Sequence, residues 1–280
     1  MTINKIAAFS LENQGGNPAG VLLCKEMLTD LEMLNIAKEV NYSETAFIAQ
    51  QEDSFRIRYF SPQTEIAFCG HATIASGKVL GETYGEGNYT LILNDGEINL
   101  KVEKKDDEFF STFSSVETHT KDMDFEVAKE ILDIFNLKVE DLDPRFPIKV
   151  SFSGNYHPII FVNSRETLKN INYDFDKAKE LMENESFTTV SILFCENELL
   201  YHSRNAFAFG GVYEDPATGS AAVALAEYLR NIKFKVSGEI EILQGFDMNV
   251  PCRIIASYEA TQGSSVDVSG QSRLIKEESK

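Results

Sequence analysis

The two halves of the chain repeat the same series of short patterns, and this repeat restricts the fold more than any other feature of the sequence. The offset between the copies grows from 138 residues (16 to 154) to 149 residues (70 to 219), as small insertions in the second copy would produce. Two similar lobes are therefore predicted. The corresponding segments are 16–23 with 154–161, 31–40 with 175–184, 43–48 with 186–191, 58–61 with 204–207, and 70–75 with 219–224.

Each copy predicts the same local structures. An apolar strand is followed by an amphipathic helix, which Thr29-Asp30 can cap in the first copy and Asp174 in the second. The last segment is a helix of small residues, apolar on all sides, and such a helix is normally buried. We therefore expect an α+β fold of two pseudo-symmetric lobes, each a curved mixed sheet around a central helix. The lobes are expected at 1–112 and 113–263, with the tail at 264–280 returning to the first lobe.

Composition and charge exclude several kinds of partner. The chain has 280 residues, of which 43% are hydrophobic, which is enough for a globular core. Its formal net charge of −18 disfavours nucleic acid and anionic membranes, because both would repel it. No apolar run reaches the roughly 18 residues that a membrane span needs. The first residues do not have the pattern of a signal peptide, so we expect a cytoplasmic protein.

The cysteines and glycines predict neither a metal nor a nucleotide cofactor. The four cysteines are far apart and form no C-x-x-C pair, so free thiols are expected rather than structural zinc. The glycine-rich stretch 15–20 lacks the G-x-G-x-x-G spacing, and Pro18 stands where a phosphate-binding helix would begin. The cysteines are Cys24, Cys69, Cys195 and Cys252.

Both small-residue helices begin at a glycine, at Cys69-Gly70-His71 and at Thr218-Gly219-Ser220. The first turn of a helix carries unpaired backbone N–H groups and the positive end of the dipole, and glycine lets a ligand approach them. Either glycine alone would indicate only an ordinary turn that leads into a helix. Because the arrangement occurs twice, we expect the two helix starts to converge on one cleft that binds a small carboxylate.

Glu44 breaks the symmetry between the copies, since its counterpart by sequence offset is Phe187. A glutamate at the start of an apolar strand is expected to be partly desolvated. Desolvation favours the neutral carboxyl group, which suits proton transfer near neutral pH. The alternative is an exposed glutamate at the end of a strand.

Asp215 and His71 are the other candidates for acid–base or hydrogen-bonding work. The Asp215-Pro216 pair requires an extended or turn conformation before the second helix, where Thr218 can act as the N-cap. Asp215 could instead only bond the turn backbone, and His71 could be a core histidine without a chemical role.

Cys69 could be a reactive thiol, because a helix start stabilises the thiolate. A symmetric mechanism with two cysteines is excluded, since Thr218 stands at the matching position of the second copy. A racemase that uses Cys69 together with a carboxylate remains an alternative.

Five motifs make the chain resemble the PhzF-like family of phenazine biosynthesis, within the wider diaminopimelate epimerase-like fold. Together they span most of the chain in the family's order, and the combination is more specific than any one motif. They are GNPAGV at 16–21, SETAF at 43–47, RYFSP at 58–62, CGHAT at 69–73 and EDPATGSA at 214–221.

The resemblance implies two barrel-like lobes, an active site between them and proton transfer on a small carboxylate without a cofactor. It implies that Glu44 is the catalytic acid–base and that His71 and Asp215 act beside it. It also suggests a homodimer. Cys69 stands where the phenazine enzymes of the family often carry a small residue, which leaves the substrate open. The residues expected to bind substrate are Cys69, Gly70, Thr218, Gly219 and Ser220.

The leading hypothesis is thus a cofactor-independent isomerase or epimerase that acts on a small carboxylate. Two alternatives are kept: a cysteine-assisted amino-acid racemase, and a protein that binds a metabolite without turnover.

Overall fold

The computed structural model describes residues 2–105 and 108–276, which form two compact units. The first unit contains residues 1–114 together with 269–280, and the second contains residues 115–268. The sequence placed the boundary after residue 112 and the start of the returning tail near residue 264. Residues 277–280 of that tail lie outside the described part of the chain.

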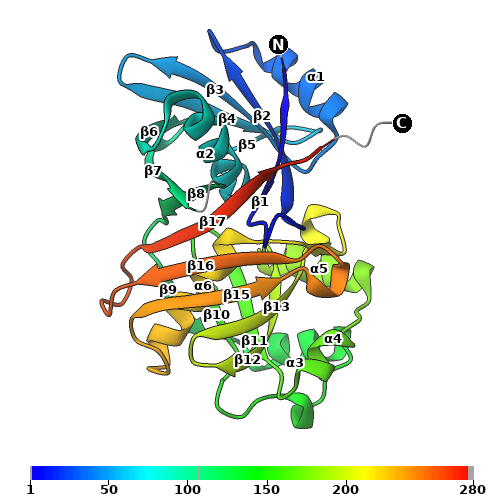
Figure 1. The fold of residues 1–280 in the computed structure, drawn as a ribbon. Helices are drawn as coiled ribbons and strands as arrows, with labels where there is room; N and C mark the ends of the chain where they lie inside the picture. The colour runs from blue at the N-terminus through cyan, green and yellow to red at the C-terminus, as the bar shows by residue number, and fades with distance from the viewer. Residues whose placement is uncertain (1, 106–107, 277–280) are drawn as a thin grey trace. The chain divides into compact units, whose positions relative to one another are not determined.

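The first unit is a closed barrel of strands around one helix (Figure 1). Two segments lie outside the barrel wall: α1 packs on β3 and β4, and β5 pairs with β4. The elements of the wall and its surroundings are β1 (Asn4–Ala8), β2 (Asn17–Cys24), α1 (Asp30–Val40), β3 (Thr45–Gln51), β4 (Ser54–Phe60), β5 (Glu65–Ile66), α2 (Gly70–Tyr84), β6 (Gly87–Leu93), β7 (Gly96–Lys105), β8 (Glu108–Ser114) and β17 (Val266–Leu274).

The barrel of the first unit is closed by β17, the last strand of the chain. Neighbouring pairs follow the order β1–β2–β3–β4–β6–β7–β8, and β17 pairs with both β8 and β1. Ile6 lies opposite Leu274 in the β1–β17 ladder, and the Ser272 hydroxyl donates to the carbonyl of Ile74 in α2 at 3.2 Å. Strand β17 is therefore built into the wall of the unit that contains β1.

Helix α2 fills this barrel, and its glycines allow the wall to come close. All residues from His71 to Gly81 are buried. A Cβ atom at Gly77 would stand 2.0 Å from the Ser111 hydroxyl, and one at Gly81 would stand 2.5 Å from the Phe109 ring. These glycines are thus required by the approach of β8, because any side chain would overlap it.

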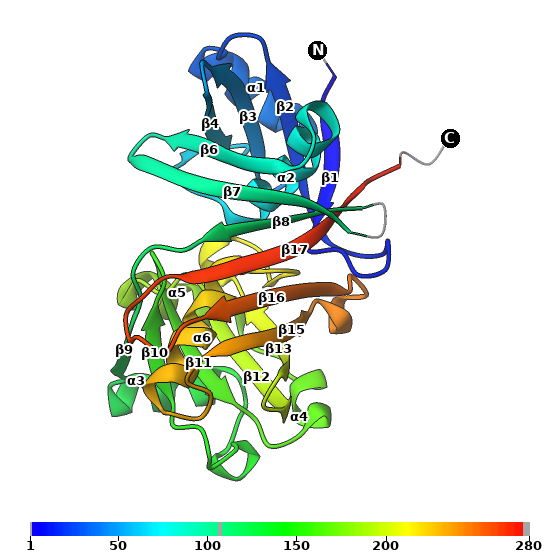
Figure 2. The same ribbon diagram turned by 60° about the vertical axis from the view of Figure 1, so that its left-hand side comes forward.

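The second unit has the same plan, with strands curved around helix α6 (Figure 2). Neighbouring pairs follow the order β9–β10–β11–β12–β13–β15–β16. Its elements are β9 (His119–Asp122), α3 (Phe125–Ile134), η1 (Val139–Asp141), β10 (Lys149–Phe152), β11 (Tyr156–Phe161), α4 (Arg165–Lys169), α5 (Phe175–Glu185), β12 (Val190–Asn197), β13 (Leu200–Ala206), η2 (Ala208–Gly210), β14 (Glu214–Asp215), α6 (Gly219–Asn231), β15 (Gly238–Gln244), η3 (Phe246–Met248) and β16 (Cys252–Tyr258).

Strand pairing confirms the internal repeat. In both units the pairing is parallel, antiparallel, parallel and antiparallel in turn: β2–β3–β4–β6–β7 in the first unit and β11–β12–β13–β15–β16 in the second. The two units therefore share one α+β architecture, a curved mixed sheet wrapped around a central helix.

The register corrects one predicted match. Thr45 lies opposite Phe60, which lies opposite Glu65, while Val190 lies opposite Ala206, which lies opposite Glu214. The residue before Val190 is Thr189, so Thr189 is the counterpart of Glu44 and Phe187 is not. The sequence alignment was two residues out here because side chains alternate between the two faces of a strand, and a shift of two conserves that alternation.

The predicted helix caps are confirmed in both amphipathic helices. Thr29 and Glu32 form a capping box at α1, and the Asp174 carboxylate accepts a bond from the backbone N–H of Lys177 at α5. Among the helices of residues 2–105 and 108–276, none is long and apolar enough to cross a membrane.

Candidate active site

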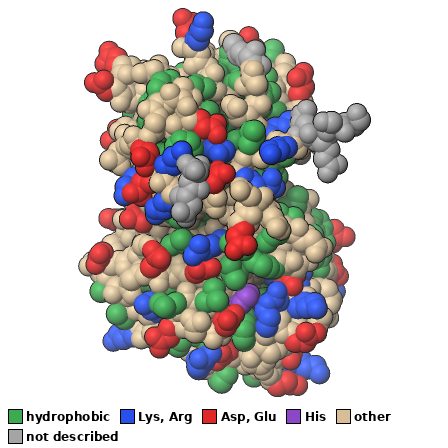
Figure 3. Space-filling model, in the orientation of Figure 1, with side chains coloured by type: hydrophobic (Ala, Val, Ile, Leu, Met, Phe, Trp, Pro, Cys, Tyr) green, Lys and Arg blue, Asp and Glu red, His purple; other side chains and the backbone are tan. Residues whose placement is uncertain are grey.

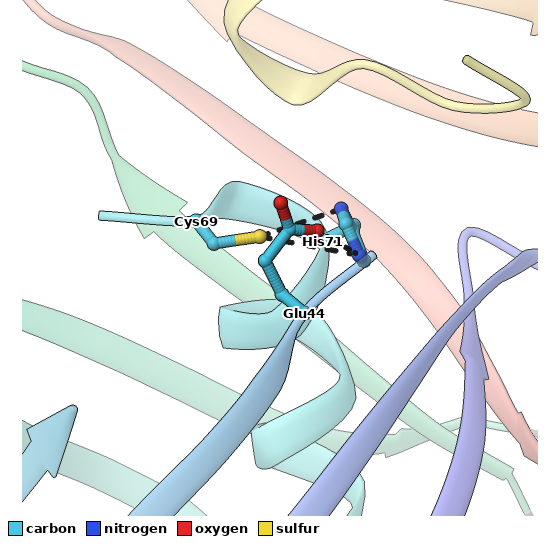
Figure 4. A group of neighbouring side chains, drawn as sticks. All are labelled: Glu44, Cys69 and His71. Carbon is cyan, nitrogen blue, oxygen red and sulfur yellow. Dashed lines mark hydrogen bonds and ion pairs between the residues drawn. The ribbon is translucent and has the colours of Figure 1, made fainter. Parts of the chain in front are cut away.

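Three chemically active side chains meet at the start of α2 in the first unit (Figure 4). Glu44 is the last residue before β3, Cys69 is the N-cap of α2, and His71 is the second residue of that helix. The sequence thus placed two members of the group in one motif and the third in another, 25 residues earlier. The barrel brings them together because β3 passes beside the helix that it surrounds.

Both nitrogen atoms of the His71 ring have a partner. Nε2 stands 3.3 Å from Glu44 Oε2, and Nδ1 stands 3.4 Å from Cys69 Sγ. His71 and Cys69 are buried, while the Glu44 side chain keeps 17% of its surface exposed. The carboxylate is therefore the member of the group that solvent and small molecules reach, and the imidazole and thiol support it from inside.

Backbone contacts hold this group in place. The N–H of Gly20 donates to the carbonyl of Glu44 at 3.2 Å, which ties the glutamate to β2. The Thr73 hydroxyl bonds the Cys69 carbonyl at 2.8 Å and the Tyr59 hydroxyl at 2.6 Å. Burial raises the pKa of Tyr59, so its hydroxyl stays protonated. The start of α2 is thus fixed from two sides, as a site with defined geometry needs.

This geometry permits proton movement among a carboxylate, an imidazole and a thiol. A neutral histidine has one donor and one acceptor nitrogen, so His71 can pass a proton between its two partners. The same three side chains also offer an oxygen, a nitrogen and a sulfur atom, which all lie within 4.8 Å of one another and could hold a metal ion. Ser43 was not predicted, yet its hydroxyl stands 3.5 Å from His71 Nε2. Its place beside Glu44 in SETAF is the only signal that the sequence offered.

Asp215 belongs to the second unit, where it lies on β14 before helix α6. Thr218 is the N-cap residue of α6 by position, but its hydroxyl donates to Asp215 Oδ2 at 2.6 Å and makes no capping bond. Thr218 is therefore the N-cap residue that the sequence predicted, but its side chain does not bond the helix backbone. Its proton goes to the neighbouring carboxylate in a charge-assisted hydrogen bond, and its oxygen accepts from the Gln244 amide at 3.1 Å rather than from the helix backbone.

Gln244 and Asn205 organise the turn from Asp215 to Thr218, and the sequence did not identify them. The buried Gln244 amide donates to the Asp215 carbonyl at 2.7 Å and accepts from the backbone N–H of Thr218 at 3.2 Å. Asn205 donates to the same Gln244 oxygen at 3.0 Å. No sequence signal connects Gln244 with a turn 26 residues earlier, because the contact arises only when β15 pairs beside β13.

An arginine–glutamate pair supports the short strand that carries Asp215. Glu214 is buried and forms an ion pair with Arg204 on β13. In the first unit, Glu65 pairs in the same way with Arg58 at 2.6 Å. The two arginines stand at matching positions of the repeat, and Arg58 also opens the RYFSP motif. They fasten β5 and β14 to the strands before them.

The remaining predicted residues lie at the helix starts. Gly70 opens α2, and Gly219 and Ser220 open α6. The Ser220 carbonyl accepts a bond from the Ser153 hydroxyl at 2.8 Å, which ties the first turn of α6 to the loop after β10.

Over the face shown in Figure 3, acidic and basic side chains are interspersed.

The duplicated fold, with a carboxylate, an imidazole and a thiol at the start of a central helix, places the chain in the isomerase and epimerase class. The chain belongs to the family described as phenazine biosynthesis-like protein, whose model matches residues 6–278.

Relatives and solved structures agree with this membership. The chain is 30% identical to the trans-2,3-dihydro-3-hydroxyanthranilate isomerase of Pseudomonas aeruginosa. The 278 aligned residues cover 97% of this chain and 96% of that relative. It is also 30% identical to an uncharacterized isomerase of Clostridium acetobutylicum, over 80% of this chain and 78% of that protein. A PhzF-family protein of Bacillus anthracis has the same fold, with a TM-score of 0.87 at 24% identity, covering 98% of this chain and 96% of that one. The chain is an isomerase of this family.

Proposed function

We propose that the protein isomerises a small carboxylate by moving a proton between two of its carbon atoms, without a cofactor, and that Glu44 carries the proton. The observation that supports this most directly is the position of Glu44, partly exposed and 3.3 Å from a buried histidine. A carboxylate of this kind can remove a proton from bound substrate and return it at another carbon.

His71 has a supporting role in this proposal. Its imidazole faces Glu44 on one side and Cys69 on the other, so it can orient the carboxylate and polarise the substrate. The N–H groups at the start of α2, beginning at Gly70, favour an anionic group near them. Such preorganised donors are often the largest contribution to catalysis.

Residues of the second unit enter the proposal through the resemblance in sequence. Asp215 would polarise the same substrate, held in position by Thr218 and Gln244. Gly219 and Ser220 would supply the second helix start for the carboxylate. The relative from Pseudomonas aeruginosa is named for trans-2,3-dihydro-3-hydroxyanthranilate, a cyclic amino carboxylate, which makes compounds of that kind the first to be tried.

The test is exchange of substrate protons with solvent deuterium. A thermal-shift screen of cyclic and amino carboxylates, including that dihydro-hydroxyanthranilate, selects compounds that bind. Proton NMR in deuterated buffer then follows incorporation of deuterium at carbon. We expect Glu44→Gln to lower the exchange rate by at least about 1,000-fold, because the amide cannot accept the proton, while the thermal shift by the ligand persists.

A charge-matched control separates chemistry from general effects. Glu39→Gln removes the same charge from an exposed position on α1, and we expect it to exchange at the wild-type rate. Unchanged exchange in Glu44→Gln would rule out the assignment of the proton carrier. Binding without exchange by the wild-type protein, across the whole panel, would favour a metabolite-binding protein instead.

The pairing of Cys69 with His71 favours one second candidate, a cysteine-assisted amino-acid racemase. A thiol 3.4 Å from an imidazole nitrogen can exchange a proton with it. The two candidates differ in their response to Cys69→Ala. Full turnover in that variant eliminates the racemase, whereas loss of exchange at the α-carbon of an amino acid supports it.

A further inference from the structure

Besides its acid–base capacity, the group at the start of α2 has the composition of a metal site. Glu44 offers a carboxylate oxygen, Cys69 a sulfur and His71 a nitrogen, and these ligand atoms lie within 4.8 Å of one another. Zinc accepts all three ligand types, and its open sites use three protein ligands and leave the fourth position for a small molecule. The soft sulfur atom disfavours magnesium and calcium, which bind oxygen ligands.

The distances fit a tetrahedral ion. Ligands at about 2.0–2.3 Å from zinc stand roughly 3.3–3.8 Å from one another. His71 Nε2 is 3.3 Å from Glu44 Oε2 and 3.9 Å from Cys69 Sγ. The Cys69 sulfur stands closer to Nδ1, at 3.4 Å, so an ion bound at Nε2 requires the Cys69 side chain to rotate toward that nitrogen.

Burial and charge make the group suitable for a cation. The thiol and imidazole are already desolvated, and the partly exposed Glu44 leaves a route for an ion to enter. A thiolate and a carboxylate together neutralise a divalent ion. The positive end of the α2 dipole opposes the ion, which limits the affinity and makes binding reversible.

We propose that Glu44, Cys69 and His71 form a reversible zinc-binding site in the first unit. The ion would occupy the carboxylate and the imidazole that the proposed function uses, so zinc would inhibit the isomerase. The inhibition rests on the proposed function, whereas the binding does not.

Cobalt is the probe, because a cobalt–thiolate bond gives a charge-transfer absorption that reports the sulfur ligand directly. The full chain, kept reduced and freed of metal with a chelator, is titrated with Co²⁺, and Zn²⁺ then displaces it. We expect one equivalent of Co²⁺ to produce the charge-transfer band together with the visible bands of tetrahedral cobalt. A wild-type protein without these bands would overturn the proposal.

Two variants and one control assign the ligands. Cys69→Ser should lose the charge-transfer band and weaken binding by more than about 100-fold, since the loss of even an outer-shell partner costs 10–100-fold. Glu44→Gln should keep the band with weaker affinity. Cys24→Ser, a change at another buried cysteine of the same unit, should bind as the wild type does. A band that persists in Cys69→Ser would contradict the assignment.

The deuterium-exchange assay separates this inference from the proposed function. Exchange that is present and inhibited by Zn²⁺ near the concentration that displaces Co²⁺ supports both. A cobalt site in a protein that exchanges nothing leaves the metal site standing and removes the proposed function. Exchange by a protein that binds no cobalt leaves the proposed function standing and removes the metal site.

Discussion

His71 and His157 are both buried, but their surroundings give them different chemistry. His71 meets a carboxylate and a thiol, while His157 on β11 contacts the Thr189 hydroxyl through Nδ1 at 2.8 Å. Complete burial lowers the pKa of His157 to about 3, because no opposite charge compensates for the lost hydration of its protonated form. Thr189 is also the counterpart of Glu44, but His157 lies on a strand and is not the counterpart of His71, which lies at the start of the central helix.

The low pKa of His157 predicts a loss of stability in mild acid. Above about pH 6.5 the imidazole is neutral in both the folded and the unfolded chain and contributes no pH dependence. Below that value the imidazole is protonated in the unfolded chain but stays neutral in the folded chain down to about pH 3. The free energy of unfolding therefore falls as the pH decreases. This residue alone should cost about 2–3 kcal/mol between pH 7 and pH 4.5. Urea unfolding of His157→Gln should show a shallower dependence over this range.

Exposed His119 on β9 provides the control for that measurement. The unfolding free energy of His119→Gln should follow the wild-type curve, displaced by a constant at most. If the curve for His157→Gln also runs parallel to the wild type, the imidazole is not held neutral in the folded protein.

At the level of elements, the two central helices solve the same packing problem with different small residues. Helix α2 uses Gly77 and Gly81 where β8 comes close, whereas α6 is filled with alanine and has no glycine after its first residue. The wall of the first barrel therefore lies too close to its helix to admit even a methyl group.

This packing predicts that Gly77→Ala destabilises the protein, although alanine is the better helix former by about 1 kcal/mol. The new Cβ atom would stand 2.8 Å from the Ser111 Cβ, which cannot move without its strand. Overpacking of this kind should lower the free energy of unfolding by about 1–3 kcal/mol, measured by urea denaturation. The exposed Thr83→Ala in the same helix is the comparison, and it should change stability by less than about 0.5 kcal/mol. A Gly77→Ala variant as stable as the wild type would show that β8 can move away from α2 without loss of stability.

For the whole molecule, the decisive feature is the return of the last strand to the first unit. β17 stands between β1 and β8, and without it both strands would present unpaired edges. A chain that ends at Val268 should therefore lose cooperative unfolding and form aggregates, as followed by circular dichroism and size-exclusion chromatography.

A chain that ends at Leu274 keeps the whole of β17 and should unfold within about 1 kcal/mol of the full chain. If the chain that ends at Val268 unfolds at the wild-type urea midpoint, the barrel does not depend on its closing strand.

Local residue chemistry accounts for what could be predicted. The caps at Thr29 and Asp174 and the apolar helices at 70–75 and 219–224 depend on neighbours in sequence, and the structure contains them. The α+β fold and the family followed from the repeat and its motifs. The match of Glu44 with Phe187 failed because a strand's register is decided by its hydrogen-bonded partner rather than by its own residues.

Local patterns predict the elements, their duplication and the residue types available for chemistry, because capping, periodicity and motif spacing act over a few residues. The packing of the chain sets the 3.3 Å distance between Glu44 and His71, directs the Thr218 hydroxyl to Asp215, and brings Gln244 to that turn. These contacts join side chains from strands and helices far apart in the chain. Their distances are set by how the strands pair and how closely they pack against the central helices, which no local pattern encodes.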